Sequence, residues 1–190
     1  MIELKYKTPI EWARGVVDAM DDFLPDHAAA EKKASSMAMT MVAHYPDKPE
    51  LVMAMVDLAL EELNHFRAVV KLMQQRGLQL LPDEKDPYVN ALRRCCRQGD
   101  LPYLLDRLLV AGIIEARGAE RFGLVADALP EGELKRFYDL ITRSELGHQA
   151  LFFDLAINYA DHATVSTRLD ELLDAEAAIV RELPFRAALH

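Results

Sequence analysis

Apolar residues recur at intervals of three and four positions along most of the chain, which is the spacing of one face of an α-helix. Prolines and glycines interrupt this pattern, and no segment alternates apolar and polar residues as a β-strand does. The pattern predicts seven helices, over about 8–22, 25–44, 49–76, 87–98, 100–128, 131–160 and 165–182. The predicted fold class is therefore all-α.

Polar motifs predict where several of these helices begin and end. Thr8 and Glu11 have the spacing of a capping box, and a second capping signal begins at Asp47. Asp86 is followed by a proline, which is favoured at the first position of a helix. Gly77 follows a cation at the expected end of the third helix, as is typical of a helix C-terminus.

Each of the four longer helices carries a glutamate in the middle of its apolar face. These glutamates are Glu31, Glu62, Glu115 and Glu145. Two of them are followed three residues later, on the same helix face, by a histidine, His65 and His148. Ionised carboxylates in a helix-bundle core cost several kcal/mol each and repel one another, unless cations lie between them. The pattern therefore predicts a metal site.

The spacing and the donor types define this site further. Glu31 and Glu62 lie 31 residues apart, and Glu115 and Glu145 lie 30 apart, as two similar helical hairpins require. Four carboxylates and two imidazoles supply enough ligands for two metal ions, and this donor set suits iron, manganese or zinc.

Two other glutamates, Glu61 and Glu120, lie about 100–140° around their helices from the metal-facing side. We expect both to be solvated and neither to bind metal.

Composition fits one soluble globular domain over residues 1–190, since 51% of the chain is apolar and 28% is charged. No apolar run reaches the ~20 residues that a membrane span requires, and the first residues lack the pattern of a secretory signal. The only cysteines, Cys95 and Cys96, are adjacent and cannot build a disulfide framework, which favours the reducing cytoplasm. They also cannot hold an iron–sulfur cluster, so electrons for oxygen chemistry must come from a separate protein.

The charge is uneven along the chain. The net charge is −9, but residues 67–143 contain 13 Lys and Arg against 11 Asp and Glu. Arg93, Arg94 and Arg97 are the densest basic cluster and are candidate contacts for RNA phosphates. Arg117 could either support the nearby Glu115 or contact RNA.

The order of the six candidate ligands resembles the ferritin-like di-iron superfamily, whose core is a four-helix bundle. A narrower resemblance, to the tRNA 2-methylthio-N6-isopentenyladenosine hydroxylase (MiaE) family, lies in the stretches around them. These stretches are Asp26-His27, Glu62 to Phe66, Gln75-Arg76-Gly77, Ile114 to Arg117, Glu120 to Phe122, Lys135 to Tyr138 and Arg143 to Glu145.

This resemblance implies a non-haem di-iron monooxygenase. It implies a tRNA substrate, in which the isopentenyl side chain of a hypermodified adenosine is hydroxylated with O2 and electrons from a ferredoxin- or reductase-type protein. By analogy with the superfamily, Glu31 and His65 would be the terminal ligands of one iron ion, Glu115 and His148 those of the other, and Glu62 and Glu145 would bridge.

Three alternatives remain open on the sequence. A ferritin- or bacterioferritin-like iron store uses the same ligands, and a cage-sized particle in gel filtration would indicate it. Another di-iron oxidase would leave no hydroxylated nucleoside. A purely structural bundle would contain no metal in elemental analysis.

Overall fold

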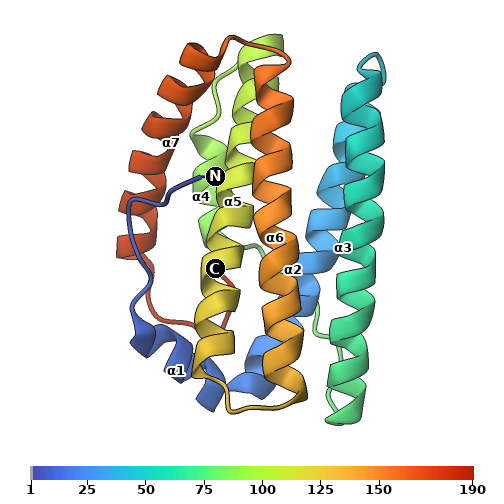
Figure 1. Cartoon of the computed structure of the whole chain (residues 1–190), viewed down its shortest axis with the longest axis vertical. Coiled ribbons are helices and arrows are strands. Elements are labelled where there is room, and N and C mark those ends of the chain that lie inside the picture. The colour runs from blue at the N-terminus through green and yellow to red at the C-terminus, as the bar shows by residue number, and fades with distance from the viewer. Residues whose placement is uncertain (1) are drawn as a thin grey trace. The chain divides into compact units, whose positions relative to one another are not determined.

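All of the secondary structure in the computed structural model, which describes residues 2–190, is helical (Figure 1). Within this range there are seven helices, α1 (Ile10–Asp18), α2 (Met20–His44), α3 (Pro49–Gln75), α4 (Pro87–Arg94), α5 (Asp100–Ala128), α6 (Glu133–Ile157) and α7 (His162–Glu182). The predicted all-α class is confirmed.

Helices α3 and α5 follow the predicted bounds closely, but α1, α2 and α4 differ. Helix α1 ends at Asp18, four residues before the expected end near Asp22. We expected α2 to begin at Pro25, whereas it begins five residues earlier and contains that proline in its second turn. Proline has no N–H, so its presence there costs the helix one backbone hydrogen bond. Helix α4 ends at Arg94, with Cys95 as its C-cap, and does not continue to Gly99.

The capping predictions are partly confirmed. The Asp86 side chain accepts a hydrogen bond from the Val89 backbone N–H at 3.0 Å, and Gly77 has a positive φ of 72°. The capping box at Thr8 is wrong, because Thr8 donates both its backbone N–H and its hydroxyl to Glu120, at 3.2 and 2.8 Å. The Asp47 cap is also wrong, because α3 has a different N-cap residue with no side-chain cap bond.

The backbone forms two compact units. One consists of residues 2–17, 85–186 and 190, and the other of residues 18–84 and 187–189. We call them the α5–α6 unit and the α2–α3 unit and describe each by itself. The single domain expected from the sequence stays a prediction.

The α2–α3 unit is an antiparallel helical hairpin (Figure 1). Arg76, just after α3, pairs with Asp21 at the start of α2 at 2.6 Å, so the two helices run in opposite directions. Ser35 of α2 donates to the Ala59 carbonyl of α3 at 2.8 Å in the middle of the pair. The apolar side chains that are fully or almost fully buried include Leu24, Met41, Leu51, Met55, Leu58 and Val69.

In the α5–α6 unit, α5 and α6 lie side by side, and α4 and α7 pack against α5 (Figure 1). Helix α5 is buried on most of its circumference. Buried charges tie it to its neighbours: Asp106 of α5 is fully buried and accepts hydrogen bonds from Arg97 and Arg168. A carboxylate buried in this way is stable because two guanidinium groups neutralise it.

Candidate metal centre

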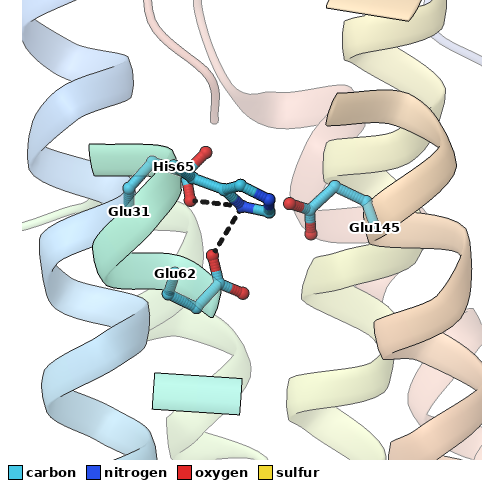
Figure 2. Close-up of side chains that lie close together, drawn as sticks. All are labelled: Glu31, Glu62, His65 and Glu145. Carbon is cyan, nitrogen blue, oxygen red and sulfur yellow. Dashed lines mark hydrogen bonds and ion pairs between the residues drawn. The ribbon is translucent and has the colours of Figure 1, made fainter. Parts of the chain in front are cut away.

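The α2–α3 unit brings three of the six candidate ligands together. Glu31 comes from α2, and Glu62 and His65 come from α3, where a spacing of three residues places them on one face. His65 Nδ1 lies 3.5 Å from Glu31 Oε2 and 3.2 Å from Glu62 Oε2. Figure 2 shows the imidazole with dashed lines to both carboxylates. Both carboxylates are buried, Glu31 at 4% and Glu62 at 1% exposed.

A second histidine supports Glu31. His27 lies one helical turn before it on α2, is fully buried, and has Nε2 2.6 Å from Glu31 Oε1. A donor at this distance fixes the orientation of the carboxylate, in the manner of the outer hydrogen bonds that hold metal ligands. The i, i+4 spacing of His27 and Glu31 could have indicated this contact from the sequence.

The electrostatics of this cluster favour a cation. Burial by itself would raise the pKa of Glu31, but hydrogen bonds from His27 and His65 outweigh burial and hold that pKa well below its ordinary value. Burial would lower the pKa of His65, yet its contacts with Glu31 and Glu62 raise the pKa to about 9. The two carboxylates therefore stabilise positive charge between them.

The α5–α6 unit brings together the other three candidates. Glu115 of α5 and Glu145 and His148 of α6 each offer a ligand atom, and these atoms lie within 4.8 Å of one another. His148 Nδ1 is 3.3 Å from Glu145 Oε2. All three side chains are buried. Each unit thus carries one glutamate and one Glu-x-x-His pair, gathered at one place.

The donor chemistry of these clusters fits a metal ion. Each offers two carboxylates and one imidazole, a set that iron, manganese and zinc accept. Two buried carboxylates within a few ångströms of each other repel, and a cation between them relieves that repulsion. Thiolates take no part, since Cys95 and Cys96 lie at the end of α4 and are free. The structure therefore supports a metal site, and the donor set leaves the identity of the metal open.

The two glutamates excluded as ligands behave differently. Glu61 is exposed, as expected. The expectation of a solvated Glu120 is wrong: this side chain is mostly buried and accepts hydrogen bonds from Thr8 and Arg117. Arg117 itself is fully buried and pairs with Glu176 of α7 at 2.8 Å, so it is closed to RNA.

The arginine cluster lies on and just after α4. Arg93 and Arg94 are exposed in the last turn of that helix. Arg97 is also exposed, but its guanidinium pairs with Asp106 at 2.7 Å. Arg93 and Arg94 thus present charge to solvent, whereas Arg97 also serves the packing of α5.

Comparison with known proteins decides the family. A family model described as tRNA-(MS[2]IO[6]A)-hydroxylase (MiaE) matches residues 2–190. A Pseudomonas putida protein named tRNA 2-(methylsulfanyl)-N(6)-isopentenyladenosine(37) hydroxylase is 35% identical over 186 residues, which cover 96% of this chain and 90% of the relative. The chain belongs to the MiaE family. A Salmonella typhimurium protein with the same name is 31% identical over 169 residues, covering 87% of this chain and 62% of that protein.

Membership in the MiaE family makes the chain an enzyme, a tRNA hydroxylase.

Among solved structures, the chain is similar to "Protein 43 with aldehyde deformylating oxygenase activity from Synechococcus". That match has a TM-score of 0.93 and 33% identity, and it covers 98% of this chain and 94% of the other. It confirms the expected ferritin-like fold. Within residues 2–190, no helix is both long and apolar enough to cross a membrane.

Proposed function

We propose that the protein hydroxylates the isopentenyl side chain of 2-methylthio-N6-isopentenyladenosine in tRNA, as a non-haem di-iron monooxygenase. One observation carries this proposal. In a chain that matches the MiaE family over residues 2–190, each helical hairpin gathers one glutamate and one Glu-x-x-His pair into a buried cluster. This is the ligand pattern of carboxylate-bridged di-iron bundles.

The six ligands of the proposal are Glu31, Glu62, His65, Glu115, Glu145 and His148. Iron bound by them would supply the activation of O2 that insertion into an unactivated C–H bond requires. The chain's own contribution is positional: His27 holds Glu31 by a 2.6 Å contact, and burial of the carboxylates keeps bulk water from them.

The reaction requires electrons from outside the chain. Hydroxylation converts the C–H bond, O2, two electrons and two protons into the C–OH group and water. Two adjacent cysteines cannot bind an iron–sulfur cluster, so a ferredoxin- or reductase-type protein must supply the electrons. Free thiols at Cys95 and Cys96 suit a reaction in the reducing cytoplasm.

Phosphate contacts with tRNA are proposed for the arginines on and after α4. Arg93 and Arg94 are exposed, and they can approach a phosphate without breaking an internal ion pair that the structure shows. Arg97 shares its charge with Asp106 and is expected to contribute less.

A second candidate function follows from the likeness to the Synechococcus protein. Its described activity is that of an aldehyde deformylating oxygenase, and its chain is 33% identical to this one. Incubating the iron-loaded protein with straight-chain aldehydes under O2 and a reductant tests this candidate directly. Turnover of aldehyde without any change in tRNA would favour it over the tRNA substrate.

The test of the proposed function is mass spectrometry of tRNA nucleosides from cells with and without the protein. We expect a nucleoside that has gained one oxygen atom only where the protein is present. The Glu62→Ala variant should abolish this nucleoside and lose bound metal. The control Asp57→Ala, an exposed carboxylate five residues earlier on α3, should retain both; Glu61 is unsuitable because its Oε1 lies 3.9 Å from His65 Nε2. Identical nucleosides from the two kinds of cell would contradict the proposal.

A further inference from the structure

The α5–α6 unit contains a cavity that the metal clusters do not use. Its volume is about 430 Å³, within the ~300–1,000 Å³ typical of small-molecule sites. The walls come from the start of the chain, from α1, from Arg121 of α5 and from the segment that follows α7. Trp12, Arg121, Phe185, Arg186 and His190 are among the side chains that line it.

Arg121 places a buried positive charge at this cavity. Its side chain is only 6% exposed, and its guanidinium lies over the Trp12 ring, 4.8 Å from the centroid. Burial, and then the neighbouring charge of Arg117, lower the pKa of Arg121 to about 10. The Glu120 and Glu176 carboxylates raise this pKa by less than burial and Arg117 lower it, so a further anion in the cavity would stabilise the charge of Arg121.

The balance of charge around the cavity is positive. Two arginines, Arg121 and Arg186, line it against one carboxylate, Glu11, which is itself well exposed. The chain as a whole carries a net charge of −9, so the positive charge at this cavity is opposite in sign to the net charge of the molecule. A positive cavity on an acidic protein is suited to an anionic ligand.

His190 adds an unsatisfied polar atom. Its Nδ1 lies 3.1 Å from Asp86, its ring stacks on Tyr88, and its side chain is 5% exposed. Its Nε2 is buried and has no hydrogen-bond partner among residues 2–190. Leaving such a group unpaired costs ~1–3 kcal/mol, which a polar ligand group could recover.

Phe185 gives the cavity an exposed aromatic wall. This side chain is 60% exposed, and its ring lies against α1 at Gly15. A Cβ atom at position 15 would lie 2.6 Å from the ring, so glycine is needed there for the ring to keep its place. Aromatic side chains of this kind stack on nucleobases.

We propose that this cavity binds a phosphate-bearing nucleotide of the RNA substrate, with Arg121 and Arg186 on the phosphate and the aromatic wall on the base. Guanidinium groups bind phosphate through paired hydrogen bonds. The choice of RNA rests on the proposed function. Arg121 follows Glu115 by six residues, about 9 Å along α5 and on another face of it, so the nucleotide bound here is a different one from the modified adenosine.

Trp12 is the only tryptophan of the chain and therefore reports on the cavity. The experiment titrates the iron-loaded protein with adenosine 5′-monophosphate, adenosine, inorganic phosphate and an anticodon stem-loop RNA, and follows Trp12 fluorescence. Arg186→Ala removes an exposed phosphate contact without disturbing the core, and Arg14→Ala is the matched control, an exposed arginine on α1 that does not line the cavity.

We expect the nucleotide and the stem-loop to change the fluorescence, and Arg186→Ala to weaken both affinities about tenfold, the equivalent of one charge-assisted contact. Adenosine alone should bind far more weakly. Equal affinities of the Arg186 and Arg14 variants for the stem-loop would overturn the proposal. Binding of inorganic phosphate as tight as that of the nucleotide would overturn the base contact, and binding of the nucleotide but not the stem-loop would overturn the RNA assignment.

The hydroxylation assay separates this proposal from the proposed function. If the wild-type protein hydroxylates tRNA while the two variants bind the stem-loop equally, the cavity proposal fails and the proposed function stands. If nucleotide and stem-loop bind as expected but no tRNA is hydroxylated, the proposed function fails and the cavity remains an RNA-binding site.

Discussion

The fully buried ion pair between Arg117 and Glu176 yields a quantitative prediction about stability. Arg117 Nε and Nη2 donate to the two oxygens of Glu176, at 2.8 and 3.0 Å, which joins α5 to α7. Glu176 also accepts from the Tyr88 hydroxyl at 3.1 Å. The substitution Glu176→Gln keeps the shape of the side chain but removes its negative charge. The buried guanidinium of Arg117 then has one carboxylate partner fewer.

Removing one partner of a buried ion pair costs about 3–5 kcal/mol of unfolding free energy. Glu120 still accepts from Arg117 after the substitution, and the Tyr6 carbonyl does so at 2.9 Å, so the lower end of that range applies. We expect Glu176→Gln to lose about 3 kcal/mol, which lowers the melting temperature of a chain of this size by roughly 6–12 °C.

Urea unfolding followed by circular dichroism measures this loss. The control is Glu171→Gln, because Glu171 pairs with Arg168 at 2.6 Å but is 58% exposed. Pairs exposed to this degree contribute at most about 1 kcal/mol. If Glu176→Gln destabilises the protein no more than Glu171→Gln does, the reasoning about this buried pair is refuted.

Three further outcomes are expected. Ferrous iron at 100 times its dissociation constant should stabilise the folded protein by about 2.7 kcal/mol for each bound ion and raise the melting temperature by roughly 5–11 °C per ion; an unchanged melting temperature would argue against a buried metal site. The double variant Arg93→Ala/Arg94→Ala should weaken binding to all tRNAs alike and flatten its salt dependence in filter-binding assays, with iron content unchanged. Burial raises the pKa of Asp86, but its hydrogen bond with His190 outweighs burial and lowers the pKa from 3.8 to about 2. Ionised Asp86 therefore contributes about 2 kcal/mol to the free energy of unfolding, and this contribution is present above about pH 4 and lost as the pH falls through 2. Asp86→Asn should accordingly destabilise the protein at pH 7 but not near pH 2 in urea titrations.

The helices could be predicted from the sequence because their signals are local. The period of apolar residues and the punctuation by glycine and proline depend only on neighbours along the chain, and α3 and α5 begin and end within a residue of the expected positions. Candidate ligands could be named for the same reason, since a glutamate within an apolar helix face is visible in the sequence. Their assignment as ligands stays a prediction.

Contacts between distant residues could not be predicted in this way. Thr8 was expected to cap a helix, but it bonds Glu120, which lies 112 residues away. Arg117, the partner of Glu120, is buried because the start of the chain and α7 both pack on this side of α5, where Arg117 donates to the Tyr6 carbonyl and to Glu176. A charge on the polar side of a helix is solvated only when nothing else packs there.

The central claim is that the two clusters together hold two iron ions. Anaerobic titration of the metal-free protein with ferrous ions, followed by elemental analysis after desalting, tests it most directly. Saturation at two equivalents per chain is the predicted result, because six candidate ligands in two sets of three, five of them buried, provide for two ions. Saturation at one equivalent, or no retained iron, would contradict the account.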